Sequence, residues 1–146
     1  MSAPRRHNRT RRSPKRLGAA AVEFALTAPI LFMLLFAALE FGRVNMIRET
    51  VSNAAYEAAR TCIVPGATNA EGVDAADRII RSIGVRDAKI QIQPSTITDT
   101  TPSVTATVTV PYNTNLWMPP FYFADGSAST TCTLIRDWAV STRSSE

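Results

Sequence analysis

Residues 17–39 read LGAAAVEFALTAPILFMLLFAAL, and this stretch decides how the rest of the chain is interpreted. It is apolar except for one charged residue, Glu23. A carboxylate costs about 2.5 to 3.5 kcal/mol at the middle of a bilayer, so a charge in an apolar run marks a function by default. The alternative is that Glu23 lies at the edge of a plain membrane anchor and extends into the headgroups.

Basic residues are concentrated directly before this run. Of the 16 Lys and Arg residues, seven fall within residues 1–18, which contain no Asp or Glu. The rest of the chain contains nine basic and 12 acidic residues. A basic segment next to an apolar run is typical of a cytoplasmic N-terminus. Nucleic-acid binding is the competing interpretation. We expect no nucleic acid among the partners, because anionic headgroups can receive these charges.

The apolar run has the length of a permanent membrane helix rather than that of a cleaved secretory signal. About twenty apolar residues cross the hydrocarbon core, and 1.5 Å per residue gives this run roughly 34 Å. A secretory signal has small residues after its apolar region, whereas here residues 18–21 precede it. Pro29 predicts a bend that membrane helices tolerate. We expect a transmembrane helix over residues 19–40, with everything after it outside.

The helix is expected to continue as an amphipathic segment over residues 41–64. Apolar residues recur there at steps of three and four, and charged residues take other positions. The apolar positions are Phe41, Val44, Ile47, Val51, Ala55, Ala58 and Cys62. Pro65 and Gly66 end the pattern. An apolar stripe on a helix outside the membrane must be buried, so we expect residues 65–146 to pack on it.

Residues 65–146 predict a small α+β domain. Thr68 and Glu71 are spaced as a capping box for a short second helix that ends before Gly84. Apolar and polar residues alternate over 88–92, 104–110 and 130–134, which predicts three strands. The fold class is therefore α+β, with a long N-terminal transmembrane-plus-amphipathic helix, a short second helix and a small three-stranded antiparallel sheet on the helix stripe.

The two cysteines, Cys62 and Cys132, lie on the inward faces of their expected elements. Disulfides persist outside the cytoplasm, so we expect a bridge between them. Closing a loop of about seventy residues would stabilise the outer domain by roughly 4 kcal/mol on the chain-entropy model. The alternative is two buried free thiols.

No arrangement typical of a catalytic or cofactor site occurs in the sequence. The one histidine, His7, lies in the basic segment, and there is no metal-ligand spacing, phosphate-binding glycine loop or nucleophile elbow. Asp74 and Asp77 are expected to face solvent rather than to form a catalytic pair. We expect a protein that is not an enzyme and that needs no cofactor or metal.

An aromatic segment follows the second expected strand. It contains Trp117, Phe121, Tyr122 and Phe123, and it is richer in aromatic residues than a solvated loop requires. It either caps the sheet or offers a contact surface for a partner.

Three blocks of the N-terminal region resemble the TadE-like pseudopilins of the tight adherence (Tad) pilus system. They are GAAAVEFAL at 18–26, APIL at 28–31 and LEFGR at 39–43. The sequence AAYEAAR at 54–60 also resembles the alanine-rich helix end of that family. The resemblance covers about residues 16–62 and implies a pilin-like helix. The fold predicted for the residues after Pro65 is based only on their pattern of apolar and polar residues.

The resemblance implies processing at the membrane. A prepilin peptidase would cut between Gly18 and Ala19, remove the basic cytoplasmic leader 1–18 and leave Glu23 as the fifth residue. The new α-amino group, which is positive near neutral pH, could then pair with the Glu23 carboxylate of a neighbouring subunit, so neither charge would be buried alone. Without processing, Gly18 would be an ordinary flexible junction.

The function implied is that of a minor pilin, or pseudopilin, required to assemble a Tad/Flp-type pilus in surface adhesion. Its partners would be the bacterial inner membrane, the prepilin peptidase, other pilin subunits and the assembly machinery. Its single span would leave the domain 65–146 in the periplasm. The first alternative is an uncleaved single-span membrane protein with a periplasmic partner-binding domain, and the second is a membrane-anchored enzyme.

Overall fold

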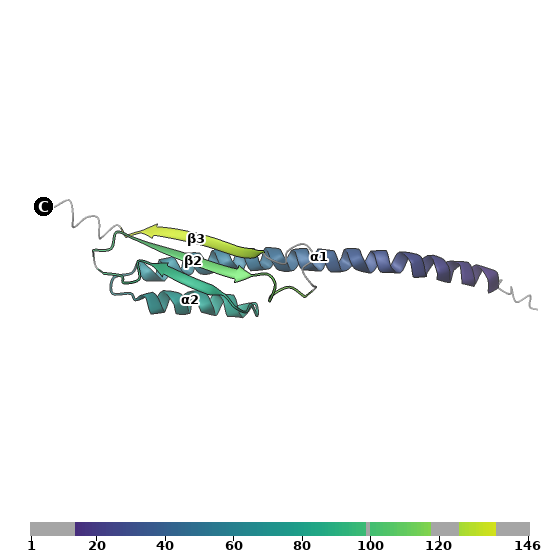
Figure 1. Ribbon diagram of the computed structural model, residues 1–146, viewed down its shortest axis with the longest axis horizontal. Coiled ribbons are helices and arrows are strands. Elements are labelled where there is room, and N and C mark those ends of the chain that lie inside the picture. Colours follow the sequence, from purple (N-terminus) through teal and green to yellow (C-terminus); the bar gives the residue numbers. More distant parts are fainter. Residues whose placement is uncertain (1–13, 99, 118–125, 137–146) are drawn as a thin grey trace, which may run out of the picture. The chain divides into compact units, whose positions relative to one another are not determined.

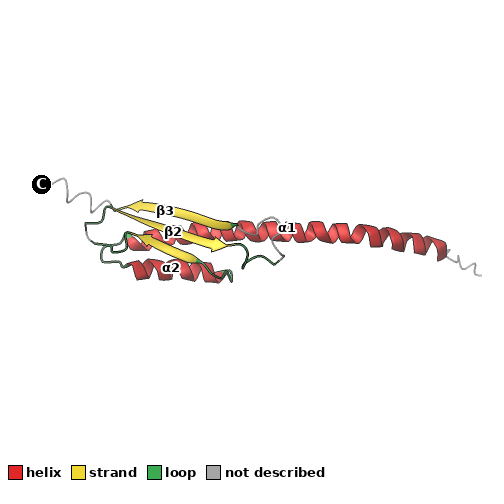
Figure 2. Cartoon of the chain, viewed as in Figure 1, coloured by secondary structure: helices red, strands yellow, loops and turns green. Residues whose placement is uncertain are grey.

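The computed structural model describes residues 14–98, 100–117 and 126–136. Its elements are α1 (Pro14–Cys62), α2 (Asn69–Ser82), β1 (Lys89–Gln93), β2 (Ser103–Pro111) and β3 (Ser127–Ile135), as Figure 1 shows. Figure 2 distinguishes the two helices from the three strands. The predicted α+β class, with a long helix, a short helix and a three-stranded antiparallel sheet, is confirmed. The chain divides into two units, Met1–Leu39 and Glu40–Glu146.

The first unit contributes the N-terminal part of α1. Its large apolar side chains from Val22 to Leu39 are 47% to 73% exposed. A helix that is apolar on all sides belongs in an apolar environment, and α1 contains a segment long and apolar enough to cross a membrane. Pro29 lies inside the helix and does not end it.

Helix α1 begins at Pro14, five residues before the predicted start of the transmembrane helix at residue 19. Proline is favoured in the first turn of a helix, because its missing N–H would have no intrahelical partner there. The residues that follow, Lys15, Arg16 and Leu17, are good helix formers. The helix therefore extends into the segment that the sequence assigned to the leader.

The second unit has one core, built mostly from alanine and β-branched residues. Helix α1, helix α2 and strand β2 all contribute to it, so both helices pack on the inward face of the sheet. The fully buried members are Ile47, Ala54, Ala55, Ala58, Ala59, Ala76, Ala106, Val108 and Val110. These side chains fill the space between the helices and the inward face of the sheet.

The sheet has the strand order β1-β2-β3, and both pairs are antiparallel. Alternate residues of β2 are buried, as the predicted period of two requires. On the outward face, hydroxyl groups pair across β2 and β3, with Oγ1 atoms 2.9 Å apart for Thr105 and Thr133 and 3.0 Å apart for Thr107 and Thr131. Such cross-strand pairs stabilise the sheet and fix its register.

The predicted capping box begins α2. The Thr68 backbone N–H donates to the Glu71 carboxylate at 2.9 Å, and the Glu71 N–H donates to the Thr68 hydroxyl at 3.4 Å. Gly72 then faces α1 so closely that a Cβ there would overlap Cys62 Sγ and lie 2.8 Å from Ile92 Cδ1. The absence of a side chain at Gly72 therefore sets how near α2 comes to the end of α1.

Arg136 ties the end of the sheet to the end of α1. Its side chain is only 2% exposed, although it is charged. The guanidinium donates to the carbonyl groups of Ile63 at 3.3 Å, Val64 at 3.2 Å and Thr98 at 2.8 Å. A buried guanidinium is tolerated where its N–H groups find acceptors. Here they hold the α1–α2 and β1–β2 connections to the residue that follows β3.

Candidate functional site

The predicted processing residues lie early in α1. Gly18, Ala19 and Glu23 are all exposed, and a Cβ built on Gly18 would meet no atom within 4 Å. Ala19 and Glu23 are four residues apart, so they lie on the same side of the helix. The bond between Gly18 and Ala19 lies just after the first turn of α1, whose N–H groups have no intrahelical partners.

Glu23 differs from the other polar group nearby, Thr27. The Thr27 hydroxyl donates to the carbonyl groups of Glu23 at 3.0 Å and Phe24 at 3.4 Å, so its polar atom is satisfied within the helix. No residue in the described part of the chain donates to the Glu23 carboxylate. In an apolar environment this carboxylate would need a partner from outside the described residues.

A second carboxylate, Glu40, lies where the apolar run ends. Glu40 is half-buried, and its Oε1 accepts a hydrogen bond from the Trp117 backbone N–H at 2.8 Å. The Trp117 side chain is 72% exposed, so this ring does not cap the sheet. The other predicted contact residues, Phe121, Tyr122 and Phe123, lie outside the described residues.

The two predicted bridge partners are both free thiols. Cys62 is buried and its Sγ donates to the Thr68 carbonyl at 3.7 Å, whereas Cys132 is half-buried on β3 opposite Ala106. Burial raises the pKa of the Cys62 thiol. A Cβ built on Gly72 would meet both Cys62 Sγ and Ile92 Cδ1, and Ile92 of β1 is in register with Ala106 of β2 and Cys132 of β3. Cys62 therefore lies beside β1, whereas Cys132 lies two strands away. The predicted bridge is not formed in this structure.

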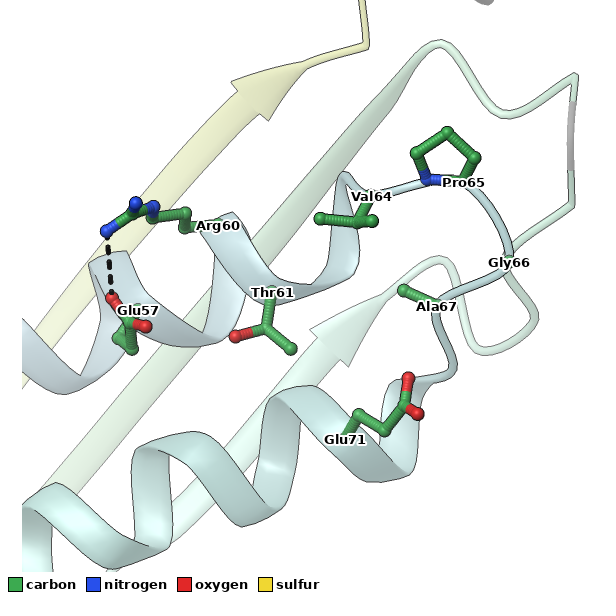
Figure 3. A pocket seen from close by; sticks show the side chains of 8 residues that line it. All are labelled: Glu57, Arg60, Thr61, Val64, Pro65, Gly66, Ala67 and Glu71. Atoms are coloured by element: carbon green, nitrogen blue, oxygen red, sulfur yellow. Dashed lines mark ion pairs between the residues drawn. The ribbon is translucent and has the colours of Figure 1, made fainter.

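A hollow of about 500 Å³ lies between the end of α1, the turn after it and the start of α2, and Figure 3 shows the side chains around it. Glu57 and Arg60 form an exposed ion pair at 3.8 Å on its rim. The Glu71 carboxylate is engaged in the capping box. The described residues contain no group of His, Cys, Asp and Glu that could hold a metal ion. The hollow therefore supports no catalytic assignment.

Sequence reasoning missed two residues that position Trp117. Glu40 was included in the membrane helix without a role, and Asn115 received no comment. The Asn115 side chain, which is buried, accepts from the Arg86 N–H at 2.8 Å and donates to the Arg86 carbonyl at 2.9 Å. A charged residue at the end of an apolar run is a signal that could have identified Glu40, whereas Asn115 had no comparable signal.

One comparison with known proteins found a match. The model of the family described as TadE-like protein matches residues 18–60, which include Gly18, Ala19, Glu23 and Glu40. The comparisons with curated proteins and with solved structures found no match. The matched range begins at the predicted scissile bond and ends two residues before the end of α1. The resemblance seen in the sequence is thereby confirmed over residues 18–60, which match the TadE-like family model.

Proposed function

We propose that this chain is a minor pilin, or pseudopilin, of a Tad pilus system, without enzymatic activity. In this proposal a prepilin peptidase cuts between Gly18 and Ala19, and the first part of α1 holds the protein in the bacterial inner membrane. The second unit then faces the periplasm. The match of residues 18–60 to the TadE-like family model supports an association with a Tad pilus, and the apolar part of α1 supports a single membrane span.

The observation that carries the proposal is the state of Glu23. It is an exposed carboxylate in an apolar helix, it has no hydrogen-bond donor among the described residues, and it lies four residues after Ala19. An α-amino group created at Ala19 would be positive near neutral pH. Pairing this amine with Glu23 of a neighbouring subunit would remove the cost of two isolated charges, which is the physical reason for assembly through this segment.

The test is an assembly assay in the native host with two matched substitutions. Glu23→Ala is expected to leave the protein in the membrane but to abolish pilus assembly, because the charge pair is lost. Thr27→Ala, one turn further along the same side of α1, is expected to assemble normally, because the Thr27 hydroxyl is already satisfied within its helix. Normal assembly of Glu23→Ala would overturn the proposed role.

The processing step has a separate test. Gly18 has no neighbour that a larger side chain would strike, so Gly18→Leu would leave the fold intact and act only on the peptidase. The variant is expected to accumulate as a precursor that retains residues 1–18. A wild-type protein that itself retains residues 1–18 would instead support the alternative, an uncleaved single-span protein whose outer unit binds a partner.

A further inference from the structure

Trp117 presents an exposed aromatic ring beside the residue that follows the apolar run. Its backbone N–H is 2.8 Å from Glu40 Oε1, and its side chain is 72% exposed. Phe41, the next residue of α1, is 68% exposed. Two large aromatic side chains from distant parts of the sequence thus lie at the same level of α1, within the second unit.

The position of Trp117 is held by the residues before it. The Leu116 N–H donates to the Tyr112 carbonyl at 3.0 Å, and Arg43 of α1 donates to the Asn115 carbonyl at 3.4 Å. Tyr112 is itself buried, and its hydroxyl accepts from Arg48 Nε at 3.0 Å. Trp117 is therefore exposed on a turn that hydrogen bonds hold in place.

The length of the apolar run sets the depth at which this ring would lie. Residues 19–39 span about 31 Å as a helix, close to the roughly 30 Å thickness of the hydrocarbon core. Glu40, Phe41 and Trp117 would then lie in the headgroup layer. Tryptophan is enriched there because its ring is apolar while its indole N–H bonds to water or headgroups. Residues 112–124 contain no charged residue that would oppose such a contact.

We propose that Trp117, together with Phe41, is an interfacial anchor that inserts into the lipid headgroup region on the outer side of the membrane. The inference rests on the proposed membrane span. Glu40 acts as a positioning residue, because its carboxylate accepts the Trp117 N–H at a depth where backbone groups have fewer water partners. The second unit then contacts the lipid surface at Trp117 as well as along α1.

The experiment uses the full chain with Trp138→Phe, so that Trp117 is the remaining tryptophan, reconstituted into phosphatidylcholine–phosphatidylglycerol vesicles. Flotation first reports whether the chain is held in the bilayer. Tryptophan fluorescence is then measured with lipids brominated near the headgroup end or near the terminus of the acyl chain. We expect shallow bromines to quench Trp117 at least about twofold more than deep ones, because the ring lies at the interface.

Two further variants make the result specific. Glu40→Ala is expected to weaken quenching by the shallow bromines, and Glu40→Gln, which keeps an acceptor oxygen, is expected to preserve it.

If Trp138→Phe does not fold, the difference between the wild-type protein and Trp117→Phe isolates the same signal. Flotation without any lipid quenching, together with full access to acrylamide, would overturn the interfacial anchor and point to a protein partner. Failure to float would overturn the membrane span as well.

Discussion

The two halves of α1 use apolar residues in opposite ways. Before residue 40 the apolar side chains are large, point in all directions and are exposed, with Phe24 and Leu26 each at 69%. After residue 43 they are mostly small or β-branched, are confined to one side of the helix and are buried, with Ile47 and Ala58 at 0%. The charged residues change as well, from one carboxylate in an apolar run to regular polar positions on the opposite side.

One continuous helix can therefore serve two environments. The second unit does not bury the apolar side chains of the first half of α1, so lipid or other subunits must cover them. An apolar stripe is covered by the sheet and α2 of the same chain. Substitutions in the first half should therefore act on insertion and assembly, and substitutions in the second half on folding.

The largest expected effect comes from removing buried volume in the second half. Ile47→Ala should lower the free energy of unfolding of the second unit by about 3 kcal/mol, because a fully buried side chain leaves a cavity. Phe32→Ala, in the first half, should change it by less than about 0.5 kcal/mol. Hydrogen exchange of the β2 amides in the full chain, held in detergent micelles, measures both. Equal effects of the two substitutions would contradict the division of α1.

The second prediction concerns Arg136, which joins β3 to the end of α1. Arg136→Met keeps an apolar side chain but removes one donor from the carbonyl groups of Ile63, Val64 and Thr98. The Val64 and Thr98 carbonyl groups still accept backbone N–H groups, so a loss of about 2 to 3 kcal/mol is expected. Arg78→Met on the exposed side of α2 is the matched control and should have little effect. Urea unfolding of the full chain in micelles compares them, and a neutral Arg136→Met would show that the contact is dispensable.

Two glycines on the helices provide a third, smaller contrast. Gly72→Ala should destabilise the second unit by about 2 kcal/mol, because the new Cβ would overlap Cys62 Sγ and crowd Ile92. Gly42→Ala, whose Cβ would meet nothing within 4 Å, should stabilise the helix by up to about 1 kcal/mol. Thermal unfolding distinguishes the two signs. Adding Cys62→Ala should recover part of the Gly72→Ala loss, and strict additivity would exclude the contact.

The smallest predicted effect is a pH dependence from Cys62. Burial raises the pKa of this thiol in the folded protein, so the folded state holds the proton more tightly than the unfolded state. The stabilisation that the protonated Cys62 thiol contributes is fully present below about pH 8.5, where an unfolded thiol stays protonated. It is lost as the pH rises through the pKa of the thiol in the folded protein. The difference in stability between the wild-type protein and Cys62→Ala, followed from pH 7 upward, should show this decline. A constant difference would show that the buried thiol does not titrate in this way.

Much of the fold was predictable because its signals are local. The alternation in β2 has a period of two, the capping box of α2 uses neighbouring residues, and the apolar stripe of α1 repeats every three or four residues. The exposed positions of Gly18, Ala19 and Glu23 likewise follow from a helix that is apolar on all sides.

The remaining features depend on contacts between residues far apart in the sequence. Glu40 and Trp117 are separated by 77 positions, and the carbonyl groups bound by Arg136 come from two different connections. A charged residue after a strand is ordinarily expected to be exposed, so the burial of Arg136 had no local signal. The expectation for Cys62 and Cys132 considered which side each faced but not the strand order. Cys62 lies beside Ile92 of β1, and β2 separates that strand from Cys132 on β3.

The central claim is that residues 18–60 form a processed pilin-like segment, and the state of the N-terminus tests it most directly. The measurement is N-terminal sequencing combined with the intact mass of the protein purified from the membranes of its native host. The account predicts a chain that starts at Ala19, which would make Glu23 the fifth residue. A chain that starts at Met1 or Ser2, in cells with an active prepilin peptidase, would contradict it.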